Sequence, residues 1–143
     1  MNQELPDLYR SELPIKEFVT KRLIGIDLDS SVQEAAKKMV ELNISSLAVL
    51  EDDEIVGFFT DGDIKRKVVA EGLSPEIPVK DIMETDLITA DIGTSVGDVF
   101  EIMSKKDVKH ILVTEGEPIV GILTFSDLID IDRQSLDTYI SRE

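Results

Sequence analysis

The sequence predicts an α+β fold built from two β-α-β-β-α repeats, packed against each other as one pseudo-two-fold module. Three observations support this prediction: an internal repeat, short apolar runs bounded by turns in each copy, and the length of the chain. The chain has 143 residues, which is close to the size of one ordinary domain. One copy of about 55 residues is too small to bury a comfortable core alone. We therefore expect the two copies to pack together.

The internal repeat can be seen by aligning the sequence with itself. A shift of 64 positions aligns residues 15–67 with residues 79–131 without a gap, and 14 of the 53 aligned pairs are identical. A gapless match of this length indicates a duplicated supersecondary unit. Between the copies lies a stretch with one Gly and two Pro, which punctuate secondary structure. The predicted organisation is an N-terminal extension at 1–14, a first domain at 15–71, a linker at 72–78, a second domain at 79–131 and a C-terminal tail or helix at 132–143.

The first copy opens with an apolar run at Leu23–Ile26, which predicts a leading strand. A helix is expected from Ser31, because an acidic residue follows three positions later in capping-box spacing and apolar residues then recur at helical intervals. Two apolar runs, Leu47–Leu50 and Ile55–Thr60, flank a polar turn and predict a hairpin. A second helix is expected over Asp61–Ala70.

The second copy predicts the same order of elements. Ser95 and Asp98 approximate the capping box with a shorter acid. The expected elements are a strand at Leu87–Ala90, a helix from Ser95, strands at Ile111–Val113 and Ile119–Thr124, and a second helix at Phe125–Ile131.

Composition excludes several classes of function. The chain carries 30 Asp and Glu against 15 Lys and Arg, a net charge of −15 that repels the phosphate backbone of nucleic acids. No apolar run approaches the ~20 residues of a membrane-spanning helix, and the N-terminus lacks a signal-peptide pattern, so a cytoplasmic location is expected. With no Cys and a single His, thiol chemistry and His-cluster metal sites are excluded. We expect no metal site, no catalytic constellation and no enzymatic activity.

One motif closes the hairpin of both copies. It reads apolar-Val-Gly-apolar-apolar-Thr-x-x-Asp-apolar and occupies residues 55–64 and 119–128. This pattern, at the end of a β-α-β-β-α unit, resembles the cystathionine-β-synthase (CBS) domain, and the resemblance covers residues 15–131. Two such domains in tandem form a Bateman module. The run at residues 60–66 is also similar to the CBS portion of arabinose-5-phosphate isomerases, although the chain has no room for their catalytic domain.

The resemblance implies a regulatory module that binds an adenosine-containing ligand, such as AMP, ADP, ATP or S-adenosylmethionine, and requires no further cofactor. In this family an Asp accepts hydrogen bonds from the ribose hydroxyls, and a Thr or Ser contacts ribose or phosphate. Such a module senses its ligand and signals to a partner protein, which the sequence does not identify. Family modules usually pair, so a homodimer is expected.

Two clefts follow residue by residue from the resemblance. The first is expected to use Thr60, Gly62 and Asp63, with Ile88, Lys109 and His110 opposite. The second is expected to use Thr124, Ser126 and Asp127, with Ile24, Ser45 and Ser46 opposite. Because Lys109 and His110 are basic residues and the two serines are not, the first cleft is the better candidate for a phosphorylated ligand. Asp61 beside it opposes a polyphosphate, which favours AMP or ADP over ATP.

These residues also have a purely structural explanation. Thr60 with Asp63, and Thr124 with Asp127, have the spacing of a capping box, which is worth about 1 kcal/mol without any ligand. On that interpretation the protein is a ligand-independent protein–protein interaction or oligomerisation scaffold. The basic run at residues 65–67 is, by default, a solvated helix face.

Overall fold

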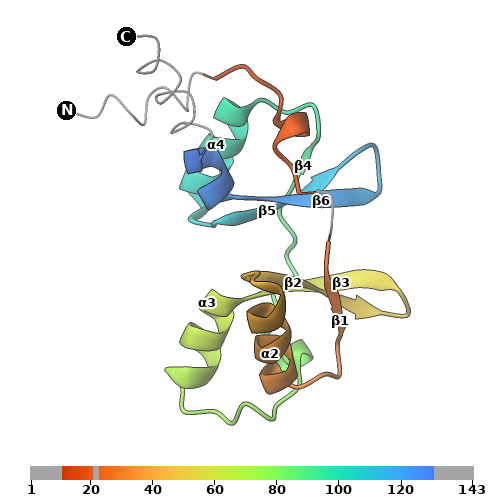
Figure 1. Cartoon of the computed structure of the whole chain (residues 1–143), viewed down its shortest axis with the longest axis vertical. Coiled ribbons are helices and arrows are strands. Elements are labelled where there is room, and N and C mark those ends of the chain that lie inside the picture. The colour runs from red at the N-terminus through yellow and green to blue at the C-terminus, as the bar shows by residue number, and fades with distance from the viewer. Residues whose placement is uncertain (1–10, 21–22, 131–143) are drawn as a thin grey trace, which may run out of the picture. The chain divides into compact units, whose positions relative to one another are not determined.

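A computed structural model of the protein describes residues 11–20 and 23–130, which form two compact α+β units (Figure 1). One unit is residues 23–87. The other joins residues 88–130 to the segment 11–20. Each unit contains a three-stranded sheet with helices, so the predicted α+β class and the β-α-β-β-α order of both copies are confirmed.

The 23–87 unit is organised around a sheet of order β1-β2-β3. Strand β1 runs parallel to β2, which requires a crossover that helix α2 provides, and β2 and β3 form an antiparallel hairpin. Leu47 and Phe59 from the hairpin pack with Met39 of α2 in the core. The elements are β1 (Gly25–Asp27), α2 (Val32–Leu42), β2 (Ser46–Glu51), β3 (Glu54–Thr60), α3 (Asp61–Asp63) and η2 (Ile64–Val69).

Helix α2 begins where the capping box predicts. The Ser31 hydroxyl accepts the Glu34 N–H at 3.0 Å, and the Glu34 carboxylate accepts the Ser31 N–H at 2.9 Å. The helix ends at Asn43, whose φ of 54° is the left-handed conformation common at helix ends. In the second copy only one half of the cap is found: the Ser95 hydroxyl accepts the Asp98 N–H at 3.1 Å.

The second helix of this unit differs from the prediction of one regular helix over Asp61–Ala70. A short α-helical turn, α3, passes into a π-helical segment, η2. The Ala70 N–H donates to the Lys65 carbonyl at 2.9 Å, an i→i+5 bond that is wider than the α-helical spacing. Segments of this kind are rare and occur frequently at functional sites.

The 88–130 unit repeats the arrangement, with a sheet of order β4-β5-β6. Phe100 and Met103 of its long helix are buried against strand residues such as Ile111 and Leu123. A second helix begins at Phe125, as predicted, and is described to residue 130. The other elements are β4 (Thr89–Asp91), α4 (Val96–Lys106), β5 (His110–Thr114) and β6 (Ile119–Thr124).

Each unit is completed by the segment that leads the other repeat. Thr20 exchanges two 3.0 Å backbone hydrogen bonds with Ile122 on β6, although Thr20 belongs to the first repeat by sequence. Glu84, its equivalent in the second repeat, exchanges two 2.8 Å bonds with Phe58 on β3. The 3₁₀ turns in these segments are η1 (Ile15–Glu17) and η3 (Val79–Asp81). The units therefore cross the repeat boundaries that the sequence suggests.

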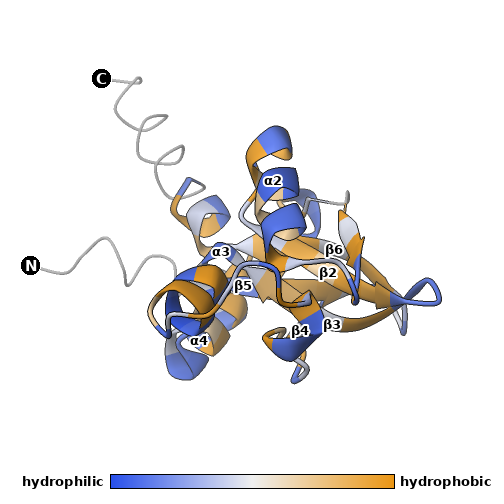
Figure 2. Cartoon of the chain, turned by 90° about the horizontal axis from the view of Figure 1, so that it is seen from below, coloured by the Kyte–Doolittle hydropathy of each residue, from blue (hydrophilic) through white to orange (hydrophobic). Residues whose placement is uncertain are grey.

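Hydropathy follows this architecture. Figure 2 shows the strands as largely hydrophobic, whereas the helices carry hydrophobic and hydrophilic faces. Within residues 11–20 and 23–130, no helix is long and apolar enough to cross a membrane. The predicted tail at 132–143 and most of the predicted extension at 1–14 lie outside the described residues.

Candidate functional site

The two Thr-x-x-Asp motifs form the same local structure at the ends of β3 and β6. The Thr60 hydroxyl accepts the Asp63 N–H at 3.2 Å, and Asp63 Oδ2 accepts the Thr60 N–H at 2.9 Å. The corresponding distances for Thr124 and Asp127 are 3.1 Å and 2.9 Å. Both motifs are therefore complete capping boxes.

Capping leaves hydrogen-bond acceptor capacity on both carboxylates. Each carboxylate oxygen carries two lone pairs, so one N–H bond to Oδ2 leaves capacity for hydroxyl protons at both oxygens. The bond from Thr60 also fixes the orientation of the Asp63 carboxylate, which is buried with 6% of the residue exposed. The capping box and the predicted ribose contact are compatible, and the geometry of the cap alone does not discriminate between them.

Strand pairing brings further predicted residues beside Thr60. Ser46 is its partner in the β2–β3 ladder, and the Asp61 N–H donates to the Ser45 carbonyl at 3.0 Å. The Ile24 carbonyl accepts the Ala48 N–H at 2.9 Å, which places Ile24 alongside β2.

The 88–130 unit repeats this grouping. His110 is the ladder partner of Thr124, and the Phe125 N–H donates to the Lys109 carbonyl at 2.8 Å. Ile88 lies alongside β5, where its carbonyl accepts the Leu112 N–H at 3.0 Å.

Each unit thus contains half of the predicted site residues, and each predicted cleft draws on both units. That pairing of residues stays a prediction. The set in the 23–87 unit is Ile24, Ser45, Ser46, Thr60, Gly62 and Asp63, and the set in the 88–130 unit is Ile88, Lys109, His110, Thr124, Ser126 and Asp127.

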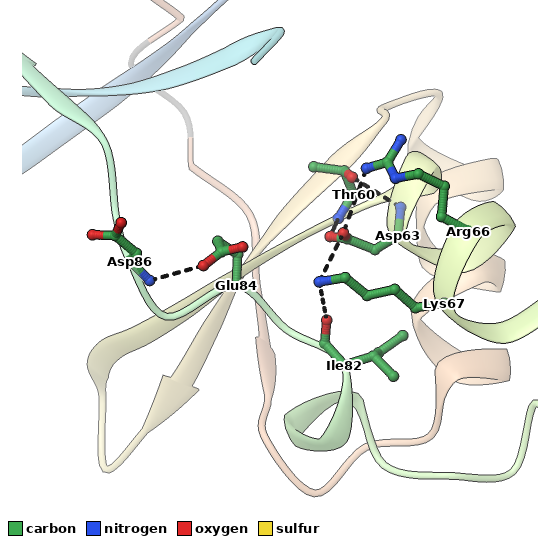
Figure 3. A network of polar contacts seen from close by, with 7 residues as sticks. All are labelled: Thr60, Asp63, Arg66, Lys67, Ile82, Glu84 and Asp86. Atoms are coloured by element: carbon green, nitrogen blue, oxygen red, sulfur yellow. Dashed lines mark hydrogen bonds and ion pairs between the residues drawn. The ribbon is translucent and has the colours of Figure 1, made fainter. Parts of the chain in front are cut away.

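Two cations next to Asp63 were not predicted as part of the site (Figure 3). Asp63 Oδ1 lies 3.4 Å from Lys67 Nζ and 3.8 Å from Arg66 Nη2. Lys67 Nζ also donates to the Ile82 carbonyl at 3.0 Å. Lys65 and Arg66 are exposed, as the interpretation of residues 65–67 as a solvated face predicts, whereas Lys67 is partly exposed and contacts both Asp63 and Ile82. The i,i+3 and i,i+4 spacing from Asp63 was the available signal.

The second copy lacks these cations. Asp130 and Ile131 stand at the positions equivalent to Arg66 and Lys67. Among the residues that the structure describes, no ion pair reaches Asp127, and no group of three or more Asp, Glu or His side chains is arranged to hold a metal ion. The two motifs share their backbone geometry and differ in charge.

Comparison with known families decides what this repeated arrangement is. A family model for the CBS domain matches residues 15–70 and again residues 79–133. The chain belongs to the CBS domain family. The relatives do not show the more specific similarity to arabinose-5-phosphate isomerases, which stays a prediction.

Three relatives illustrate the match of this CBS-domain chain. A crystal structure of an uncharacterized conserved protein from Pyrococcus horikoshii is 46% identical, with a TM-score of 0.82, covering 86% of this chain and 94% of that one. The CBS domain-containing protein YhcV of Bacillus subtilis is 26% identical and covers 80% of this chain and 81% of its own length. The CBS domain pair of protein MJ0100, solved in complex with 5′-methylthioadenosine and S-adenosyl-L-methionine, is 27% identical with a TM-score of 0.76, covering 85% of this chain and 97% of that one.

Proposed function

We propose that this CBS pair is a regulatory module that binds an adenosine-containing ligand of the AMP, ADP or ATP type through Asp63 and Asp127, and signals its occupancy to a partner protein. The observation that carries the proposal is the duplicated Thr-x-x-Asp box, in which a backbone N–H orients each carboxylate. A related CBS pair in complex with two adenosine compounds supports the choice of ligand class. Stand-alone CBS-domain proteins are typically regulatory and not catalytic.

The chemistry of a carboxylate suits a ribose. The ionised group only accepts hydrogen bonds, and it accepts from both hydroxyls of a vicinal diol at once. Because the Thr60 N–H already holds Asp63 in place, little side-chain freedom is lost when a ligand binds. A ligand that favours one conformation of the module over another shifts the population by its difference in affinity.

Thermal unfolding of the full chain in the presence of AMP, ADP, ATP, S-adenosylmethionine and NADH tests the proposal. A ligand at ~100 times its dissociation constant stabilises the fold by about 2.7 kcal/mol, which raises Tm by several degrees. We expect Asp63→Asn and Asp127→Asn each to reduce this shift, and the double variant to abolish it. The 2′-deoxy form of the ligand should give a smaller shift, because it lacks one hydroxyl of the diol.

Glu34→Gln is the matched control. It neutralises a carboxylate that accepts the N–H of its capping residue, as Asp63 and Asp127 do, and it lies outside both motifs. We expect it to lower Tm slightly and to leave the ligand shift intact. No shift with any compound at millimolar concentration, or an undiminished shift in the double variant, contradicts the proposal.

The scaffold interpretation remains the second candidate, because apolar side chains are exposed on the helices. Val40 is 80% exposed and Val69 is 70% exposed, a feature typical of interaction surfaces when such residues cluster. The predicted homodimer and the predicted cytoplasmic location stay predictions. Light scattering on the wild type and on a Val40→Ser/Val69→Ser variant, with and without ligand, measures whether these residues carry an assembly and whether that assembly depends on ligand.

A further inference from the structure

Arg66 lies beside Gly62 and Asp63 of the first motif. Its side chain is 64% exposed, and its Nη2 is 3.8 Å from Asp63 Oδ1. Its guanidinium lies close to Gly62, where a Cβ would be 2.8 Å from Arg66 Nη1 and 3.1 Å from Nη2. The second copy carries Ser126 and Asp130 at the positions of Gly62 and Arg66.

The two cations beside Asp63 have different contacts. Lys67 is 39% exposed, and its ammonium is held between the Asp63 carboxylate and the Ile82 carbonyl (Figure 3). It is therefore sufficient to balance the buried carboxylate. Among the described residues, Arg66 makes only the longer 3.8 Å ion pair, and with 64% of its side chain exposed its guanidinium keeps N–H donors for a ligand.

These contacts give the two motifs opposite local charges. Residues 60–67 contain three cations and two carboxylates, whereas residues 124–131 contain two carboxylates and no cation. A guanidinium binds phosphate oxygens in a bidentate manner, and an exposed Arg beside a ribose-binding carboxylate is within the span of one nucleotide. A carboxylate in the same place repels a phosphate.

We propose that Arg66 makes the Thr60–Asp63 motif selective for phosphorylated adenosine ligands, and that Asp130 makes the Thr124–Asp127 motif selective for adenosine compounds without a phosphate. This inference rests on the proposed function and deepens it, because it assigns a ligand class to each motif from that motif's own residues. It predicts that the two motifs are filled by different ligands from a mixture.

Calorimetric titration with adenosine and with AMP tests the part of the inference that concerns Arg66. The Asp127→Asn background isolates the Thr60–Asp63 motif. In that background, Arg66→Gln should weaken the binding of AMP by about threefold to tenfold and change the affinity for adenosine by less than about twofold. Lys65→Gln is the matched control: it removes one neighbouring positive charge from an exposed side chain that has no contact with Asp63, and both affinities should stay within about twofold.

The part that concerns Asp130 is tested in the Asp63→Asn background. Wild-type Asp130 should give tighter binding of adenosine than of AMP, and Asp130→Arg should reverse that order. Because both effects are electrostatic, raising the salt concentration from 50 mM to 500 mM should reduce each AMP-to-adenosine ratio toward one.

The outcomes separate this inference from the proposed function. If neither adenosine nor AMP binds the wild type, the inference fails, and the proposed function fails with it only when ADP, ATP, S-adenosylmethionine and NADH also give no shift in Tm. If both bind, but Arg66→Gln changes their affinities equally or Asp130→Arg leaves their order unchanged, the inference fails while the function stands. A phosphate-dependent loss in Arg66→Gln that is absent in Lys65→Gln supports it.

Discussion

Gly57 on β3 is the residue against which the segment after η3 packs. A Cβ at this position would overlap the Met83 side chain at Sδ and would lie 3.2 Å from the Glu84 carbonyl oxygen. The Phe58–Glu84 backbone bonds of 2.8 Å hold that carbonyl in place. The glycine in the motif is therefore explained by packing and not by ligand chemistry.

We predict that Gly57→Ala lowers the free energy of unfolding by about 1–3 kcal/mol, because the added methyl overpacks a tight contact. Urea denaturation measures the change. In the double variant Gly57→Ala/Met83→Ala the loss should be smaller than the sum of the two single losses, since shortening Met83 makes room for the methyl. Additive losses would show that the clash lies elsewhere.

For single residues, spacing along the sequence was enough to predict contacts between near neighbours in the chain. Thr60 and Asp63 are three residues apart, so their capping box could be inferred from the sequence. The bond from Lys67 to Ile82 joins residues 15 positions apart, and no short-range pattern specifies it. The presence of cations near Asp63, and of Asp130 and Ile131 at the equivalent positions of the second copy, could be read from the sequence, whereas the contact that holds Lys67 in place could not.

Among the elements, α2 owes its start to a titratable cap. The pKa of the Glu34 carboxyl is lowered, chiefly because its charged form accepts the Ser31 backbone N–H and secondly because of the Ser31 hydroxyl. An acid whose pKa is lower in the folded state stabilises the fold above its unfolded pKa. That contribution is lost as the pH falls through the lowered folded pKa.

We therefore predict that wild type and Glu34→Gln differ in stability at neutral pH, and that this difference shrinks between about pH 5 and pH 3. Chemical denaturation across this range measures it. Glu41→Gln is the control, because Glu41 lies on the same helix and outside the cap. An equal difference at pH 7 and at pH 3 would show that the charge of Glu34 does not contribute.

Element boundaries were predicted well where a side chain marks them. The starts of α2 and α4 follow from Ser31 and Ser95, whose hydroxyls bond to the first turn. The strand at Ile119–Thr124 was predicted with its observed bounds. The other strands were predicted one or two residues short or displaced, in part because ladders continue past the apolar run into polar residues such as Glu51. The π-helical segment η2 was missed, because the side-chain pattern that distinguishes an i→i+5 turn from an α-helical one is weak.

For the chain as a whole, the sequence revealed two equivalent repeats. It did not reveal that each repeat packs with the leading segment of the other. Periodicity shows that residues 15–20 and 79–84 are equivalent, and it contains no information on which copy each contacts. The backbone bonds supply that information: Thr20 pairs with Ile122, and Glu84 pairs with Phe58. Ile15 and Val79 are both fully buried, one in each core.

Because of this exchange, a substitution in a leading segment should destabilise the unit formed mainly by the other repeat. The repeat boundaries alone would predict the opposite. Ile15→Ala should reduce protection from hydrogen exchange in the 88–130 unit, although Ile15 belongs to the first repeat. Val79→Ala should reduce protection in the 23–87 unit. Each substitution removes a buried side chain and should cost about 2–5 kcal/mol. Hydrogen exchange read by mass spectrometry compares peptides from α4 to β6 with peptides from α2 to β3. Each variant serves as the control for the other, because the two positions are 64 residues apart in equivalent places. Greater loss of protection in the unit that shares the mutated residue's own repeat would contradict the exchange, since the core around each residue would then belong to its own copy.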